Sequence, residues 1–161
     1  MKKKNNYYYL KLLNTSRYRI IATGKVQKAW IKDAISIYKK RLPGISIIEI
    51  RDSSPAKETK TIEGLIKPDE KIIALSEEGE RVTSIALAKR LESLGSQRLV
   101  FILGGPEGLT KNIKSLAFWK LSLSPMTFPH EIARLIVLEQ IYRAQTICKG
   151  IPYHREGPIT C

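Results

Sequence analysis

A glycine-rich segment at the end of an apolar run is the first place in this sequence where a ligand could bind. Residues 99–110 read LVFILGGPEGLT, so the run ends at Leu103 and two glycines follow, beginning with Gly104. Glycine lets a ligand approach the backbone closely, and Pro106 stiffens the turn that follows. Phosphate-binding patterns such as GK[ST] and GxGxxG are missing, and Glu107 would repel an anion. Spacing alone leaves a strand-to-helix turn as good an interpretation as a ligand site.

A second apolar loop follows a later strand pattern. Residues 123–128 read LSPMTF, and Pro129 then opens a long helical pattern in the first-turn position that proline tolerates. Ligands of parallel sheets bind at the carboxyl ends of the strands, so loops from two neighbouring strands would meet at one pocket. Leu123, Met126 and Phe128 would suit a flat, mostly neutral ligand such as adenine.

Alternating short β-branched runs and helical patterns predict the elements that position these loops. Strands are predicted at residues 18–23, 45–50, 71–76, 98–103 and 119–124, and helices at 27–42, 83–94, 110–118 and 131–149. In the first helix, Trp30, Ala34, Ile37 and Tyr38 share a face. Strands separated by helices predict an α/β fold, with a mostly parallel sheet covered by helices on both faces.

Some segments depart from this pattern. Residues 1–16 carry basic and no acidic side chains, which predicts a flexible basic extension before a single domain at residues 17–161. Residues 51–61, RDSSPAKETKT, are interpreted as a polar and mobile loop. The last helix is apolar around more than one face, which suggests that one face packs on the sheet and another forms a subunit interface. Its apolar residues are Ile132, Leu135, Ile136, Val137, Leu138 and Ile141.

Composition limits the partners and the compartment. The formal net charge is +13 in 161 residues, which favours a polyanionic partner, with nucleic acid ahead of an anionic membrane surface. No apolar run approaches the length of a membrane-spanning helix, so we expect a soluble, cytosolic protein. Cys148 and Cys161 lack ligand-spaced partners, which predicts two reduced thiols and no metal site.

Two segments together resemble a known family. The sequence ILGGPEGLT and the segment at residues 121–156, which contains PHEIARLIVLEQIYRAQTICKGIPYHRE, are similar to the large-subunit ribosomal RNA methyltransferase H family of the SPOUT superfamily. Both motifs occur in the order and spacing of that family, and the resemblance runs from about residue 17 to residue 156. The basic extension and the tail GPITC lie outside its usual limits.

The resemblance implies a fold, a cofactor and a substrate. It implies a C-terminal trefoil knot, which is rare among protein folds, and a homodimer. It also implies that S-adenosylmethionine donates a methyl group to N3 of pseudouridine 1915 in 23S rRNA. By the same resemblance, the donor is held by Leu75, Gly104, Leu123, Ser124, Pro125, Met126, Thr127 and Phe128.

Catalytic candidates follow from the terminal YHRE motif. Tyr153 can stack on a base, and His154 can remove a proton or orient the base. Arg155 and Arg143 can bind phosphate or stabilise negative charge on uracil-like oxygens. Each has a structural alternative, since Arg143 can pair with Glu139 one turn earlier and the motif can be a solvated tail. His130, which follows the helix-opening proline, is interpreted as a helix-start residue satisfied by backbone groups.

Two other functions fit parts of the sequence. A SPOUT enzyme acting on transfer RNA would keep the donor pocket and change the basic surface. A non-catalytic basic RNA-binding or ribosome-associated protein explains the charge equally well, but it gives no reason for a glycine-lined strand end beside an apolar loop. Calorimetry with S-adenosylmethionine distinguishes the enzyme from a non-catalytic RNA-binding protein. Mapping of the methylated nucleotide distinguishes a ribosomal RNA substrate from transfer RNA.

Overall fold

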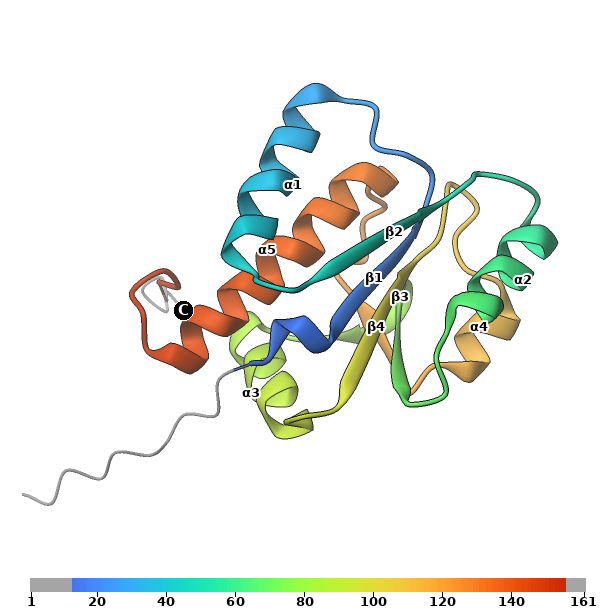
Figure 1. The fold of residues 1–161 in the computed structure, drawn as a ribbon. Coiled ribbons are helices and arrows are strands. Elements are labelled where there is room, and N and C mark those ends of the chain that lie inside the picture. Colours follow the sequence, from blue (N-terminus) through green and yellow to red (C-terminus); the bar gives the residue numbers. More distant parts are fainter. Residues whose placement is uncertain (1–12, 156–161) are drawn as a thin grey trace, which may run out of the picture.

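The computed structural model describes residues 13–155, and residues 1–12 and 156–161 lie outside that range. Within it, five parallel strands form one sheet in the order β2-β1-β4-β3-β5 (Figure 1). The strands are β1 (Tyr18–Thr23), β2 (Ser46–Ile50), β3 (Glu70–Arg81), β4 (Arg98–Leu103) and β5 (Trp119–Ser122). Because all strands run the same way, their carboxyl ends meet at one edge of the sheet.

Helices cover both faces of the sheet (Figure 1), which confirms the predicted α/β fold. Helices α1 (Ala29–Arg41), α3 (Ser84–Leu94) and α5 (His130–Lys149) lie on one face, and α2 (Pro55–Leu65) and α4 (Lys111–Leu116) lie on the other. The side chain of Thr83 accepts a hydrogen bond from Ala86 N, so it caps α3 as predicted. Gly95 ends that helix with a positive φ of 57°. The predicted trefoil knot stays a prediction.

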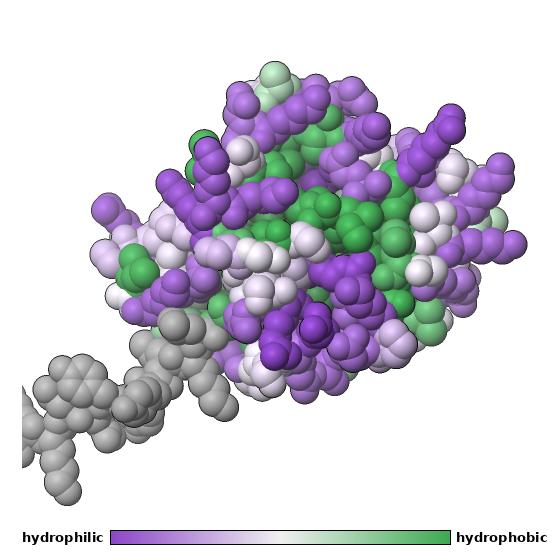
Figure 2. Space-filling model, viewed as in Figure 1, coloured by the Kyte–Doolittle hydropathy of each residue, from purple (hydrophilic) through white to green (hydrophobic). Residues whose placement is uncertain are grey.

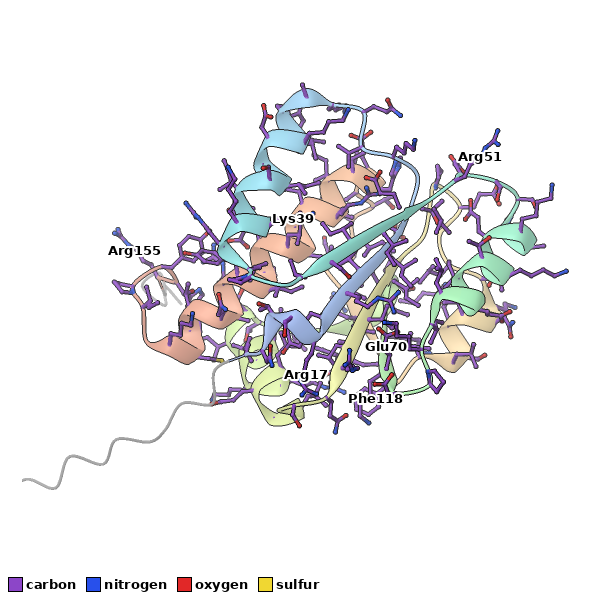
Figure 3. The ribbon with its side chains drawn as sticks, viewed as in Figure 1. Arg17, Lys39, Arg51, Glu70, Phe118 and Arg155 are labelled. Atoms are coloured by element: carbon purple, nitrogen blue, oxygen red, sulfur yellow. The ribbon has the colours of Figure 1, made fainter. Side chains whose placement is uncertain are left out.

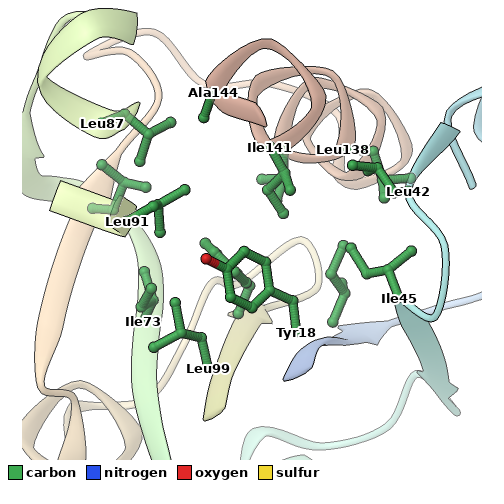
Figure 4. Packing of buried hydrophobic residues seen from close by; sticks show 14 of the residues in the cluster. Tyr18, Leu42, Ile45, Ile73, Leu87, Leu91, Leu99, Leu138, Ile141 and Ala144 are labelled. Atoms are coloured by element: carbon green, nitrogen blue, oxygen red, sulfur yellow. The ribbon is translucent and has the colours of Figure 1, made fainter. Parts of the chain in front are cut away.

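The larger core lies between the sheet and the layer formed by α1, α3 and α5 (Figure 4). Leu138 and Ile141 of α5 pack over Tyr18 and Leu99, which come from neighbouring strands. In β4, every residue after Arg98 is buried, as expected for a central strand covered on both faces. This packing fixes α5 across the sheet, so its first turn lies at the strand ends.

Two details of the predicted elements are wrong. Residues 51–61 are not a polar loop throughout, because α2 begins at Pro55. Pro55 occupies the first helical turn, and Glu58 accepts a hydrogen bond from Ser53 N before the helix. Helix α1 buries Ile31 and Ile35 rather than the predicted face, and Trp30 is 56% exposed.

The folded domain begins earlier than residue 17. Leu13 is buried in the main core, and the Thr15 hydroxyl donates to Pro43 O at 2.9 Å. Residues 13–16 of the predicted extension therefore belong to the domain. The rest of that extension, residues 1–12, lies outside the described residues.

Candidate active site

A cleft of about 780 Å³ opens where the carboxyl ends of β3, β4 and β5 meet the start of α5. Its walls come from the end of β3, the GGPEGL loop, the loop after β5 and the first turn of α5. The lining residues are Leu75, Ser76, Glu77, Glu78, Leu103, Gly104, Gly105, Pro106, Glu107, Gly108, Leu109, Lys114, Leu123, Ser124, Met126, Thr127, Phe128, Pro129, His130 and Ala133. The volume is in the range of small-molecule sites.

The GGPEGL loop folds tightly against its own backbone. Gly108 N donates to Gly105 O at 2.9 Å, and Gly108 has a positive φ of 73°. A Cβ atom on Gly104 would lie 2.5 Å from the carbonyl carbon of Gly108. Gly104 is therefore required first by the loop's own turn, because any side chain there would push the two ends of the turn apart.

The end of β3 contributes an irregular segment to the cleft. Leu121 of β5 pairs with Leu75 and again with Glu80, so residues 76–79 bulge out of the ladder. Two carboxylates of this bulge, Glu77 and Glu78, face the cleft. The ammonium group of Lys114 in α4 lies 3.4 Å from Glu78 and partly neutralises it.

The loop after β5 is held by serine hydroxyls. Ser122 Oγ donates to Ser124 O at 3.0 Å, and Ser124 Oγ accepts from Met126 N at 2.9 Å. These bonds turn the chain so that Met126, Thr127 and Phe128 line the cleft before α5 begins. The Met126 side chain is 71% exposed, which leaves an apolar surface at the cleft mouth available to a ligand.

The structure brings together most of the predicted donor-binding residues. Seven of the eight line the cleft, and Pro125 does not. Sequence reasoning missed Glu77, Glu78 and His130 as cleft residues. The two carboxylates follow an apolar strand directly, so the strand-end rule that selected the GGPEGL loop also applies to them. His130 packs against Gly24, where a Cβ atom would lie 3.0 Å from its Nε2.

The charges at the cleft favour a ligand with a positive group. Glu77, Glu78 and Glu107 line it, and Lys114 is the one lysine or arginine among its lining residues. The apolar side chains of Leu123 and Phe128 are half-buried beside these carboxylates. A molecule with a flat, neutral ring and a cationic end matches this combination.

The catalytic candidates form a separate cluster near the end of α5. The Tyr153 hydroxyl donates to Glu139 Oε1 at 3.0 Å and lies 3.2 Å from the Tyr38 hydroxyl. Its ring packs edge-on against Tyr142, with a centroid distance of 4.9 Å, and the Arg143 guanidinium lies over it. Partial burial is the main cause of a raised pKa for Tyr153, and the hydrogen bonds with Tyr38 and Glu139 raise it further. The hydroxyl therefore stays protonated at neutral pH.

Arg143 links this cluster to His154. Its Nε donates to Glu139 Oε1 at 3.0 Å, which is the predicted pairing one turn back, and this hydrogen bond raises the pKa of Arg143. Its Nη1 lies 3.2 Å from His154 Nδ1. A guanidinium only donates, so Nδ1 accepts and a neutral His154 carries its proton on Nε2. Arg155 is exposed and projects away from the body of the protein (Figure 3).

The cleft and the C-terminal cluster do not meet within one chain. His130 lines the cleft, whereas Arg143 lies 13 residues further along the same helix. At 1.5 Å per residue, that spacing corresponds to about 20 Å. The structure therefore divides the predicted site residues into two groups at opposite ends of α5.

The apolar side chains around helix α5 pack mostly within the chain. Val137, Leu138 and Ile141 are buried, while Ile132 and Leu135 are half-buried against the same core. Much of the apolar surface is thus covered by packing between α1 and α3. Within residues 13–155, no group of side chains has the make-up of a metal site, and no helix is sufficiently long and apolar to span a bilayer.

Comparison with known proteins matches nearly the whole chain. Residues 16–154 match a family model described as Predicted SPOUT methyltransferase. A protein from Synechococcus sp. (strain CC9311) named Ribosomal RNA large subunit methyltransferase H is 58% identical over 143 residues, which is 89% of this chain and 99% of that protein. A protein of the same name from Prochlorococcus marinus (strain MIT 9211) is 55% identical over 144 residues, again 89% and 99% of the two chains.

Two solved structures share the fold at low sequence identity. A probable methylase family protein from Haemophilus influenzae Rd KW20 has a TM-score of 0.56 at 11% identity, with 89% of this chain and 72% of that chain covered. The SpoU methyltransferase AviRb from Streptomyces viridochromogenes has a TM-score of 0.51 at 12% identity, with 86% and 63% covered.

Proposed function

The chain belongs to the SPOUT methyltransferase family, within the group named ribosomal RNA large subunit methyltransferase H, and we propose that it methylates large-subunit ribosomal RNA with S-adenosylmethionine as donor. The specific target that we propose is N3 of pseudouridine 1915 in 23S rRNA. A ribosomal substrate also implies a cytoplasmic location. The single observation that carries the proposal is the strand-end cleft, because it combines surfaces suited to both ends of the donor.

The cleft residues fit S-adenosylmethionine. Leu123, Met126 and Phe128 offer apolar surface for the adenine ring, while Glu77 and Glu107 offer negative charge for its cationic groups. The remaining predicted residues, Leu75, Gly104, Ser124, Pro125 and Thr127, would shape the site through strand-end and loop backbone. When bound, the donor supplies a methyl group that its sulfonium has already activated. The protein then has to position the acceptor, exclude water and stabilise the charge of the deprotonated base.

We assign these tasks on the acceptor to the C-terminal cluster. With Nδ1 occupied by Arg143, His154 can donate from Nε2 to a uracil-like carbonyl oxygen, which stabilises the deprotonated base and thereby favours loss of the N3 proton to water. Arg143 acts as a positioning residue, because Glu139 and His154 occupy its donors. Tyr153 anchors the tail through its hydroxyl and ring, and Arg155 remains free to contact a phosphate.

The separation of the two groups leads us to propose a homodimer with shared active sites. The tail of one chain would reach the donor cleft of the other, which removes the need for one chain to bridge about 20 Å along α5. An exposed apolar ridge on α1 supports association of two chains. Trp30 and Ile37 are 56% and 51% exposed, and neither side chain packs on the core.

The decisive experiment supplies the protein with methyl-labelled S-adenosylmethionine and, separately, 23S rRNA, large subunits and complete ribosomes. We expect label in one nucleotide of 23S rRNA, which mass mapping would identify as N3-methylated pseudouridine. Label in transfer RNA alone would establish the alternative SPOUT substrate. RNA binding without donor binding in calorimetry would establish the non-catalytic alternative.

A further inference from the structure

A second cavity, which we call the basic groove, lies between α1, the edge strand β2 and the first turns of α5. It encloses about 750 Å³ and is lined by Lys25, Val26, Lys32, Ile35, Ser36, Lys39, Lys40, Ile47, Glu49 and Arg134. Figure 3 places Lys39 between α1 and β2. None of these residues lines the donor cleft, so the basic groove needs an explanation of its own.

The charges of the basic groove are positive and largely uncompensated. Lys25, Lys32, Lys39 and Lys40 are exposed, and their ammonium groups form no salt bridge with any residue in the described part of the chain. The one carboxylate that lines the groove, that of Glu49, is already paired with Arg134. Four clustered cations repel one another, and a row of phosphates would relieve this repulsion.

Arg134 is the most buried residue of the groove lining and is held in place by hydrogen bonds. Its side chain is 1% exposed, and its guanidinium donates to Glu49 Oε1 and, at 2.8 Å, to Gly24 O. Its Nε has no hydrogen-bond partner among the described residues. A buried donor without a partner is uncommon in proteins and is costly to maintain.

Apart from Ser36, the remaining lining is apolar. Val26 and Ile35 are buried, and Ile47 of β2 is half-buried beside them. Figure 2 shows hydrophobic surface across the middle of this face, with hydrophilic side chains around it. An apolar floor between lysines is suited to a polymer whose charge lies on its backbone and whose bases or sugars can pack on hydrocarbon.

We propose that the basic groove binds a single-stranded segment of the RNA substrate, a step that rests on the proposed function. The lysines contact successive phosphates, and a base or ribose packs against Ile47. The first turns of α5 connect the basic groove to the donor cleft, because His130 and Ala133 line the cleft and Arg134 lines the groove. A strand that lies in the basic groove is thereby directed past the start of α5 towards the methyl donor.

The test compares two double variants that carry the same change in charge. In Lys32→Gln/Lys39→Gln the basic groove loses two cations, and in Lys57→Gln/Lys60→Gln helix α2 loses two exposed cations on the opposite face of the sheet. The probe is a labelled oligouridylate about 12 nucleotides long, titrated at several salt concentrations. We expect the groove variant to bind about 10-fold more weakly, with a salt slope reduced by about 1.4, since each single-strand phosphate contact contributes about 0.7.

Activity measurements separate this proposal from the proposed function. The groove variant should raise the KM for the ribosomal substrate about 10-fold, with kcat and donor affinity unchanged. Equal salt slopes and KM values in the two double variants would overturn the groove proposal, even if both proteins methylate rRNA. A wild-type protein that methylates no RNA would overturn the proposed function, while a groove-dependent salt slope would still support RNA binding there. A groove variant that loses binding only to phosphatidylserine vesicles would replace the RNA with a membrane surface and would overturn the proposal.

Discussion

The donor cleft and the C-terminal cluster lie at opposite ends of the same helix, and they are held in different ways. Backbone turns and strand ends form most of the cleft, including the Gly104 to Gly108 contact and the bulge after Leu75. Side-chain hydrogen bonds hold the cluster, with Glu139 as the acceptor that Arg143 and Tyr153 share. One chain therefore contains all of the cleft that we propose as the donor site. The tail, in contrast, is an anchored segment that would present His154 and Arg155 to another chain.

The largest effect is expected from removing the tail. Truncation after Gly150 should abolish methyl transfer, because His154 and Arg155 are lost, while donor affinity in calorimetry stays at the wild-type value. The cleft residues are all outside the deleted segment. Light scattering should still give twice the mass of one chain, since the exposed face of α1 with Trp30 and Ile37 is retained.

Mixed dimers test whether the two regions work across chains. A truncated subunit combined with a Gly104→Val subunit, whose β-branched side chain should abolish donor binding, should recover activity, because one of the two sites would then pair an intact cleft with an intact tail. Recovery is expected only if the cleft and the tail come from different chains. Full activity of the truncated homodimer, or no recovery in the mixture, would contradict the shared site.

A smaller effect, about 100-fold in kcat, is expected for His154→Ala. The comparison with His154→Gln identifies the role of this residue. A glutamine amide can donate a hydrogen bond but cannot take up a proton, so the Gln variant should retain much more activity than the Ala variant if His154 is a donor. Equal losses in the two variants would restore the interpretation of His154 as a general base. Donor affinity should be unchanged in both.

Much of the cleft could be predicted from the sequence because it depends on local patterns. The strands that end at Leu103 and at Ser122 are recognised by their apolar runs, and ligands of parallel sheets bind where such strands end. The role of Gly104 was harder to predict. A side chain at this position would collide with Gly108 of the same turn, so the turn itself requires glycine. The sequence indicated only that a ligand could approach the backbone closely there.

Other features depend on tertiary contacts that a sequence pattern does not specify. Helix α1 has two apolar stripes, and only the packing of Ile31 and Ile35 on the sheet decides that Trp30 is left exposed. The segment that became α2 has few apolar residues, so periodicity did not reveal it, although Pro55 at its start is a recognised helix signal. The place of Tyr153 depends on a hydrogen bond to Tyr38, which is 115 residues away in the sequence.

Gly104→Ala should weaken donor binding about 10-fold without unfolding the protein. The new Cβ would lie 2.5 Å from the Gly108 carbonyl carbon, so the turn must open and shift the cleft wall. Gly64→Ala is the matched control, because a Cβ at that position in α2 meets no atom within 4 Å. Calorimetry should show wild-type donor affinity for the control. Equal affinities in the two variants would show that the GGPEGL loop is not a wall of the donor site.

The smallest effect concerns the tyrosine hydroxyl that anchors the tail. Tyr153→Phe removes the donor to Glu139 and the contact with Tyr38 but retains the ring against Tyr142. We expect kcat to fall only several-fold, since a net hydrogen bond is worth about 1 kcal/mol.

The pKa of Tyr153 is raised in the folded protein, which determines how the anchor depends on pH. The hydroxyl is fully protonated below the unfolded-state pKa of about 10, and the anchor is lost only as the pH rises through the higher folded-state pKa.

Tyr18→Phe is the control for this last substitution. The Tyr18 hydroxyl is buried without a hydrogen-bond partner among the described residues, and burial raises its pKa to about 12. Removing it should leave the free energy of unfolding unchanged or increase it, because an unsatisfied polar group is removed from the core. Thermal melting of the two variants therefore compares a hydroxyl that anchors the tail with one that only fills space. A Tyr153→Phe protein with wild-type kcat would show that the ring alone fixes the tail, and the hydroxyl network would then have no part in presenting His154.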